Sequence, residues 1–247
     1  MACKIMVVGL GSTGNYVLDM ATKMEFFRDC VFTVGSRTEP EMAEKRLNIT
    51  RVSAGLFDLF PEIRYVRQDV TDIDGMAEVI SRNNPEIIAY TGRYMKGLKY
   101  GEYSYPNNIG YGVWLPLAVV LPERLMRAVQ RAGSNARVIN TSYGDGVSPA
   151  LAGIGLAPYA SAGNLNHLIP RIRRAVAILA GGRARPEDVD VQLLGSHYLN
   201  TYVSKEGSAR GAPDGLCASL MGATRCDITE ERIFPARGLR SFFALAP

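Results

Sequence analysis

The most informative part of the chain lies near its start, where residues 4–14 read KIMVVGLGSTG. Residues 4–9 form a short apolar run rich in Val, which is typical of a strand buried inside a parallel sheet. Three glycines, at positions 9, 11 and 14, have the spacing G-x-G-x-x-G, and residues 15–24 then show the apolar period of a helix. A strand, a glycine turn and a helix in this order predict the first βα unit of a parallel α/β sheet.

Each glycine of this turn has a physical role. Gly9 permits the tight turn, Gly11 lets the backbone approach a pyrophosphate, and Gly14 allows the helix to pack closely on the strand. The helix N-terminus directs N–H groups and the positive end of its dipole at the same anion. We therefore expect the whole turn, including Ser12 and Thr13, to bind the phosphates of a dinucleotide. The alternative is a plain glycine-rich turn.

The end of the second expected strand, residues 30–36, bears on the choice of dinucleotide. An acidic residue at this position binds the ribose hydroxyls of NAD. Here the strand ends in Ser36 and Arg37, and no carboxylate appears before Glu39. A hydroxyl and a guanidinium suit a 2′-phosphate. The sequence therefore favours NADP(H) over NAD(H), the alternative being that Arg37 is a solvated loop charge.

Later segments continue the same alternation and predict a doubly wound Rossmann sheet over residues 1–141. The remainder, residues 142–247, is expected to form a smaller α/β catalytic part that also contributes to oligomerisation. Ligands bind beyond the carboxyl ends of such strands. We therefore expect cofactor contacts from Thr91 and Gly92 after the fourth strand and from Thr141 and Ser142 after the fifth. Further strands are expected at 63–67, 86–91 and 136–141, and helices at 73–82 and 115–132.

The segment after the third strand reads Gln-Asp-Val-Thr-Asp, residues 68–72. It resembles the D-V-T-D turn of saccharopine-reductase-like and short-chain-dehydrogenase-like Rossmann proteins. The resemblance implies that Asp69 and Val70 line the adenine pocket, whereas the simpler reading is that Asp72 caps the next helix. No Tyr-x-x-x-Lys is present, which disfavours the short-chain-dehydrogenase catalytic mechanism.

Residues 136–200 resemble the lactate and malate dehydrogenase family. The resemblance rests on TSYGD at 141–145, GNLNH at 163–167 and, most specifically, PEDVDVQLLGSH at 186–197. It implies that His197 donates and accepts the proton at the substrate carbinol, a role that needs a group titrating near neutral pH.

The same resemblance places two asparagines, Asn164 and Asn166, in the segment that orients the histidine. The candidates here for the family's aspartate are Asn164, Asn166 and His167, and the two asparagines are also expected to hold the substrate together with Arg93. Arg93 lies near the family's substrate arginine and could hold an anionic group by a bidentate contact.

Composition limits the class of protein. The chain has 247 residues, is 47% hydrophobic and 21% charged, and has a net charge of +4. A full core can form, and no basic run of the kind that binds nucleic acid is present. The four cysteines lack CxxC spacing and no paired His spacing occurs, so we expect reduced thiols and no metal. We further expect a cytoplasmic protein without membrane spans, which acts on a small-molecule substrate as a homodimer or higher homo-oligomer.

Together these features predict an NADP(H)-dependent oxidoreductase, a reductase or dehydrogenase of a biosynthetic route. It would transfer a hydride to or from a carbonyl or imine of a small, polar, anionic substrate. Two alternatives remain open. One is a non-catalytic Rossmann protein that senses NADP(H), and the other is an epimerase or lyase with tightly bound NAD(P).

Overall fold

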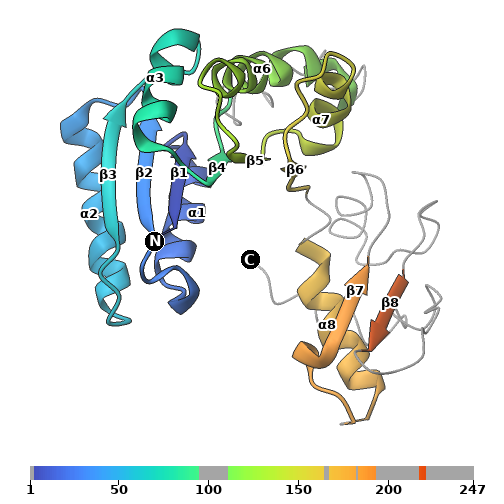
Figure 1. Cartoon of the computed structure of the whole chain (residues 1–247). Coiled ribbons are helices and arrows are strands. Elements are labelled where there is room, and N and C mark those ends of the chain that lie inside the picture. The colour runs from blue at the N-terminus through green and yellow to red at the C-terminus, as the bar shows by residue number, and fades with distance from the viewer. Residues whose placement is uncertain (1–2, 95–110, 164–166, 182, 193–216, 221–247) are drawn as a thin grey trace. The chain divides into compact units, whose positions relative to one another are not determined.

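The computed structural model describes residues 3–94, 111–163, 167–181, 183–192 and 217–220. The chain divides into two compact units, residues 1–162 and 163–247 (Figure 1). No helix among these residues is long and apolar enough to cross a bilayer.

A parallel sheet of six strands forms the centre of the first unit. The strands are β1 (Lys4–Val8), β2 (Val31–Ser36), β3 (Glu62–Arg67), β4 (Ile87–Tyr90), β5 (Arg137–Asn140) and β6 (Ala160–Ser161). Their order is β3-β2-β1-β4-β5-β6, and every neighbouring pair is parallel. This is the strand order of the doubly wound Rossmann sheet, with its switch point between β1 and β4. The predicted fold class is confirmed.

Helices cover both faces of this sheet. Helices α1 (Ser12–Thr22) and α2 (Pro40–Gly55) pack on one face, and α3 (Ile73–Asn83) and α6 (Leu115–Arg131) pack on the other. Alternate residues of β1 point into the two resulting cores, which is why the strand is apolar without interruption. The other helical segments described in this unit are η1 (Glu25–Phe27), η2 (Tyr111–Trp114) and α7 (Gly144–Ala152).

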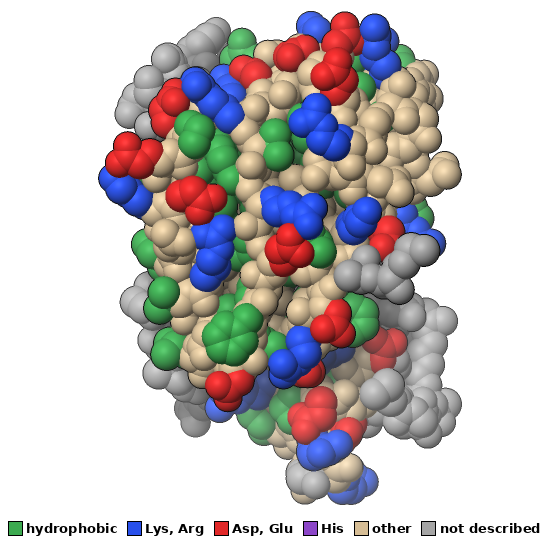
Figure 2. Space-filling view, turned by 60° about the vertical axis from the view of Figure 1, so that its left-hand side comes forward, with side chains coloured by type: hydrophobic (Ala, Val, Ile, Leu, Met, Phe, Trp, Pro, Cys, Tyr) green, Lys and Arg blue, Asp and Glu red, His purple; other side chains and the backbone are tan. Residues whose placement is uncertain are grey.

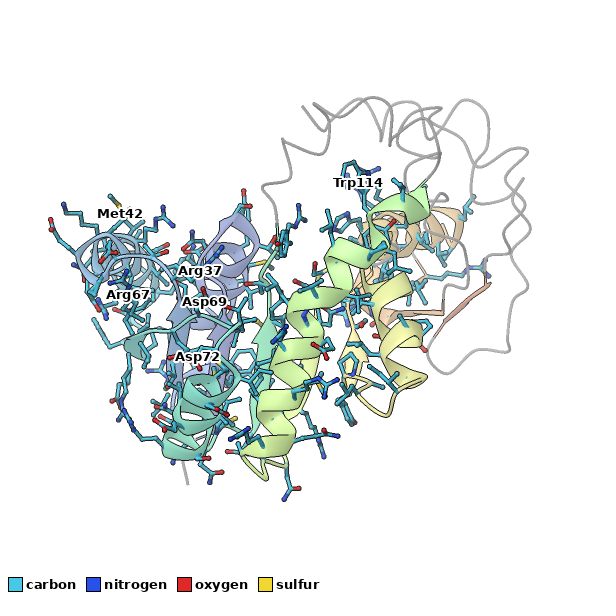
Figure 3. All side chains as sticks on the ribbon, turned by 90° about the horizontal axis from the view of Figure 1, so that it is seen from above. Arg37, Met42, Arg67, Asp69, Asp72 and Trp114 are labelled. Carbon is cyan, nitrogen blue, oxygen red and sulfur yellow. The ribbon has the colours of Figure 1, made fainter. Side chains whose placement is uncertain are left out.

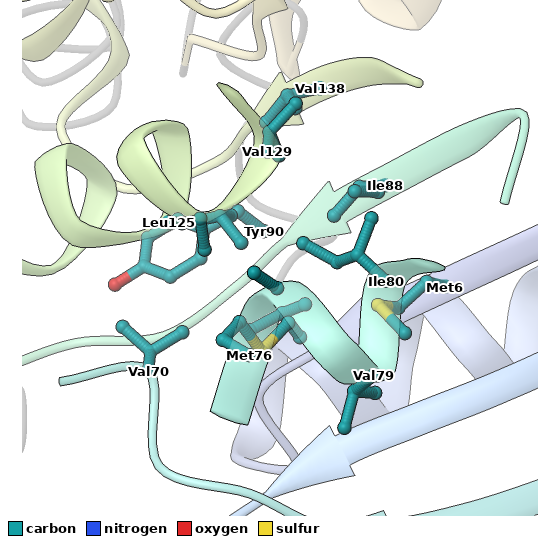
Figure 4. Packing of buried hydrophobic residues seen from close by; sticks show 13 residues of the cluster. Met6, Val70, Met76, Val79, Ile80, Ile88, Tyr90, Leu125, Val129 and Val138 are labelled. Carbon is teal, nitrogen blue, oxygen red and sulfur yellow. The ribbon is translucent and has the colours of Figure 1, made fainter. Parts of the chain in front are cut away.

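The core on the α3–α6 side is shown in Figure 4. Met76 and Ile80 of α3 pack beside Leu125 of α6, against Ile88 and Tyr90 of β4. All five side chains are almost fully buried. Each fully buried side chain of this size contributes roughly 1.5–3 kcal/mol by leaving water, so this core anchors β4 beside β1 at the switch point.

The first unit extends beyond the boundary expected at Thr141. Strand β6 pairs with β5, with Ala160 opposite Ile139 and Ser161 opposite Asn140. Because that pairing adds a sixth strand to the sheet, the first unit runs to Ala162. The functions expected for the two parts of the chain remain predictions.

The second unit has its own small sheet. Its described elements are α8 (Ile169–Leu179), η4 (Pro186–Asp188), β7 (Val189–Gln192) and β8 (Cys217–Leu220). Strands β7 and β8 are antiparallel. The segment 186–192, which carries part of the resemblance to the lactate and malate dehydrogenase family, thus forms a short turn followed by a strand.

Candidate functional site

A cleft of about 990 Å³ lies at the carboxyl ends of the central strands in the first unit. It lies beyond the ends of β1, β2, β3 and β4 and includes the switch point between β1 and β4, where doubly wound sheets bind their ligands. Many of the residues chosen from sequence meet here: Gly9, Gly11, Ser12, Thr13, Ser36, Arg37, Asp69, Val70, Thr91, Gly92 and Arg93.

The glycine turn is closed on one side and open on the other. Gly9 has a φ of +111°, which L-residues rarely adopt, and its N–H donates to the Gly35 carbonyl at 2.8 Å. A Cβ on Gly14 would lie only 2.0 Å from the Gly9 carbonyl oxygen, so the helix needs a glycine there. A Cβ on Gly11 would meet no atom within 4 Å. The turn is therefore packed behind Gly9 and Gly14 and open above Gly11.

Helix α1 begins at this open side. Gly11 is its N-cap, no side chain caps it, and no acidic residue occupies its first turn. The first N–H groups of a helix have no partner inside the helix. Gly11, Ser12 and Thr13 all line the cleft, so the positive end of the helix faces a space that a phosphate can enter.

Thr91 holds the turn in place from the neighbouring strand. Its backbone N–H donates to the Val8 carbonyl at 2.9 Å. Its buried hydroxyl lies 3.2 Å from the Val8 carbonyl oxygen and 3.0 Å from that of Gly9. Thr91 lines the cleft as expected, but these bonds make it a positioning residue for the glycine turn.

The end of β2 leaves one charged group available to a ligand. The Ser36 hydroxyl accepts from the Thr38 N–H at 3.2 Å and lies 3.1 Å from the Tyr65 hydroxyl. Arg37 is 68% exposed, and its guanidinium lies 3.9 Å from the Asp69 carboxylate; both residues are labelled in Figure 3. A solvent-exposed pair at this distance contributes little stability, so Arg37 is free to contact an added anion.

Asp69 is held in its ionised form. Burial raises its pKa, but hydrogen bonds from Thr71 and the charge of Arg37 outweigh that effect, and the pKa of Asp69 lies below its usual value. The Thr71 N–H donates to its carboxylate at 2.9 Å. Asp69 is therefore a fixed carboxylate acceptor in the cleft at neutral pH.

Among the residues of this region that were not found from the sequence, two make hydrogen bonds that shape the cleft. Arg46 of α2 lines the cleft and donates to the Leu10 carbonyl at 2.9 Å. Tyr65 of β3 donates to the Ser36 carbonyl at 3.0 Å and also bonds the Thr38 carbonyl. Both reach the site from neighbouring elements, so no local motif marks them.

The structure does not bring every expected residue to the cleft. Gly14 packs behind the turn, as described above. The Thr141 hydroxyl donates to the Tyr90 carbonyl at 3.0 Å, and the Ser142 N–H donates to the Asn140 side chain at 2.9 Å. Neither Thr141 nor Ser142 lines the cleft, and their cofactor contact remains a prediction.

The structure describes only one of the four residues expected to be catalytic. Arg93 lines the cleft next to Gly92. Asn164, Asn166 and His197 lie outside the described residues. Within the described part of the chain, no group of three or more His, Cys, Asp or Glu side chains could hold a metal ion.

Comparison with solved structures supports the fold class. No protein-family model matches the sequence, and no curated protein matches it. Among solved structures, a 6-phospho-α-glucosidase from gut microorganisms in complex with NAD and Mn²⁺ aligns over 80% of this chain and 45% of its own, with 12% identity and a TM-score of 0.54. This likeness shows the fold, and the chain is a Rossmann-type α/β protein, as expected.

Two sugar-nucleotide epimerases also align. One is a UDP-Glc/GlcNAc 4-epimerase from Campylobacter jejuni, with 17% identity and a TM-score of 0.40, covering 57% of this chain and 37% of that one. The other is a UDP-glucose 4-epimerase from Thermotoga maritima with UDP-glucose. It has 16% identity and a TM-score of 0.37, and the alignment covers 57% of this chain and 38% of that one. The chain spans less than half the length of each of the three proteins.

Proposed function

We propose that the cleft binds a nicotinamide dinucleotide and prefers NADP(H) to NAD(H). The observation that carries this proposal is the open space above Gly11 at the uncapped start of α1. A pyrophosphate needs both close backbone approach and unpaired N–H donors, and the turn offers both. The strand order and the position of the cleft at the switch point support the same ligand.

The cleft residues divide among the parts of this cofactor. Gly11, Ser12 and Thr13 would hold the pyrophosphate. Arg37 would bind the 2′-phosphate through charge-assisted hydrogen bonds. Asp69 and Val70 would lie beside the adenine. The nicotinamide, when bound, supplies hydride transfer, and the protein supplies its orientation.

We propose further that the chain is an oxidoreductase acting on a carbonyl or imine of a small anionic substrate. Arg93 supports this proposal because it gives the cleft a cation directly after β4, beside the switch point. It would hold a carboxylate or phosphate of the substrate. A proton-transfer role for His197, with Asn164 and Asn166 helping Arg93 to hold the substrate, belongs to the same proposal.

The cofactor preference is tested by titrating NADPH and NADH into the wild type and Arg37→Gln. Arg67→Gln is the matched control, because Arg67 is an exposed arginine at the end of β3, paired with Glu39 at 2.6 Å and outside the cleft. We expect Arg37→Gln to weaken NADPH binding by about 10-fold or more, the equivalent of one charge-assisted hydrogen bond. NADH binding should change little. Equal losses for both cofactors, or a loss in Arg67→Gln alone, would contradict the assignment.

The reaction is tested by NADPH oxidation with a panel of oxo and imino acids. Turnover that is lost in His197→Ala, and a KM that rises in Arg93→Gln, are the expected results. NADPH binding without turnover of any substrate would instead favour the sensing alternative. Cofactor that copurifies with the chain would favour the epimerase or lyase alternative.

A further inference from the structure

Helix α2 is apolar on two opposite sides. At 100° per residue, its buried residues Ala43, Leu47, Thr50 and Ala54 fall within an arc of roughly 60° that faces the sheet. A second set of apolar residues falls within an arc of roughly 80° on the opposite side. This second set, which we call the α2 stripe, consists of Met42, Ile49, Val52 and Leu56, the last being the C-cap.

The α2 stripe faces solvent. Its side chains are between 49% and 80% exposed, and Figure 3 shows Met42 on the outer side of α2. Tyr16 and Met20 of α1, which packs beside α2 on the same face of the sheet, are 70% and 65% exposed. Soluble monomers rarely leave such a cluster uncovered, and larger exposed apolar patches mark interaction sites.

We propose that a second copy of this chain covers the α2 stripe, through a two-fold axis that crosses the stripe at Ile49. Met42 and Leu56 each lie seven residues, or two helical turns, from Ile49. A two-fold axis at Ile49 therefore places Met42 of one copy opposite Leu56 of the other and brings the two Ile49 side chains together. An isologous interface needs this kind of self-complementary surface.

Charge beside the stripe favours a second copy over an anionic membrane. Lys45 pairs with Glu41 at 2.7 Å, and Arg51 pairs with Glu44 at 2.8 Å. A membrane-binding face carries unpaired cations that attract anionic lipids. Here each of these cations already has a carboxylate, so two copies can meet without bringing like net charges together. Figure 2 shows hydrophobic side chains at the surface with blue and red side chains around them.

The available area suits a stable interface. Side chains of this size that are about half to four-fifths exposed each offer on the order of 100 Å². The α2 stripe with Tyr16 and Met20 therefore offers on the order of 600 Å², most of the roughly 800 Å² per partner that specific interfaces bury. This inference does not depend on the cofactor, because none of these six residues lines the cleft.

The test is sedimentation equilibrium of the full chain from about 1 to 100 µM. We expect a reversible dimer for the wild type and at least a tenfold weaker dimer for Ile49→Glu, because the axis brings two carboxylates together. Ile154→Glu is the matched control, since Ile154 is 59% exposed outside the stripe. It should dimerise like the wild type.

A charge-swap mixture separates interface loss from misfolding. Ile49→Lys alone should weaken the dimer to a similar extent, but an equimolar mixture of Ile49→Glu and Ile49→Lys should recover the wild-type dimer affinity. A wild type that stays monomeric at every concentration would overturn the proposal, as would an Ile49→Glu dimer with the affinity of the wild type. Monomeric wild type that pellets with phosphatidylserine vesicles would overturn it in favour of a membrane surface.

Discussion

The three glycines of the first turn share a motif but differ in what their missing Cβ does. Position 9 requires a glycine because its φ is positive. Position 14 requires one because a Cβ there would clash with the Gly9 carbonyl. Gly11 has room for a side chain in the protein as it stands. The fold itself does not need a glycine at position 11, so Gly11 is the one of the three that the proposed dinucleotide site would require.

This difference predicts opposite effects on stability. Gly14→Ala should lower the free energy of unfolding by about 1–3 kcal/mol, because its Cβ forces the backbone of α1 away from Gly9. Gly11→Ala, with an extended backbone at φ −86° and ψ −168°, should remain within about 1 kcal/mol of the wild type. Urea unfolding of both variants measures the difference. Equal destabilisation would contradict this account of the turn.

Cys30 gives a prediction that depends on pH. Burial, with smaller contributions from Cys3 and Glu86, raises the pKa of the Cys30 thiol to about 11. Because only the thiolate reacts, about one thiol in a thousand is reactive at pH 8. We expect Cys30 to be alkylated at least 100-fold more slowly in the folded chain than in urea, as read by peptide mass spectrometry. Comparable rates would show that the thiol is not buried.

The same shift links Cys30 to stability. Since the folded pKa is raised, the stability that the buried neutral thiol contributes is present below the unfolded pKa, near 8.5. It is lost as the pH rises from there to about 11.

Sequence predicted the residues of the site that belong to one local segment. The glycine turn and Arg37 were found because their roles follow from a spacing or a strand end. Arg46 and Tyr65 were not, because each reaches the site from another element and only the folded chain brings it there. The roles of His197, Asn164 and Asn166 remain predictions.

At the scale of elements, the expected strands are present with ends shifted by one or two residues, and one long helix was missed. Helix α2 was not predicted because apolar residues lie both on its buried side and in the α2 stripe. Its sequence therefore lacks the one-sided apolar period that indicates a surface helix. The second apolar side of α2, which prevented its prediction from the sequence, is also the surface from which the interface with a second copy is inferred.

The start of α3 was expected, and its cap can be tested. The Asp72 carboxylate accepts from the Gly75 N–H at 3.0 Å. Asp72→Ala should lower the free energy of unfolding by about 1 kcal/mol, whereas Asp72→Asn should change it little because asparagine is an equally good N-cap. Chemical unfolding of the two variants in parallel decides the matter. A loss of equal size in Asp72→Asn would mean that charge, and not capping, is responsible.

At the scale of the whole molecule, the sequence predicted the class of fold but not its extent. Alternating strands and helices indicate a doubly wound sheet, yet β6 has only two residues and no pattern could reveal it. Its pairing with β5 is a long-range contact that moves the end of the first unit to Ala162.

Within the described part of the chain, the residues that line the cleft all belong to the first unit. A chain of residues 1–162 should therefore bind NADPH within a few-fold of the affinity of the full chain. Calorimetric titration of both chains measures this. A folded first unit, checked by circular dichroism, that fails to bind while the full chain binds would show that the second unit contributes to the nucleotide site.

The central claim is that a dinucleotide occupies the cleft against Gly11. Calorimetric titration of NADPH into the full wild-type chain and into Gly11→Ala tests it most directly. We expect one-site binding by the wild type and a loss of at least about tenfold, or about 1.4 kcal/mol, in Gly11→Ala. Its unfolding midpoint should remain near that of the wild type. Absence of binding by the wild type, or equal affinity in the two proteins, would contradict the claim.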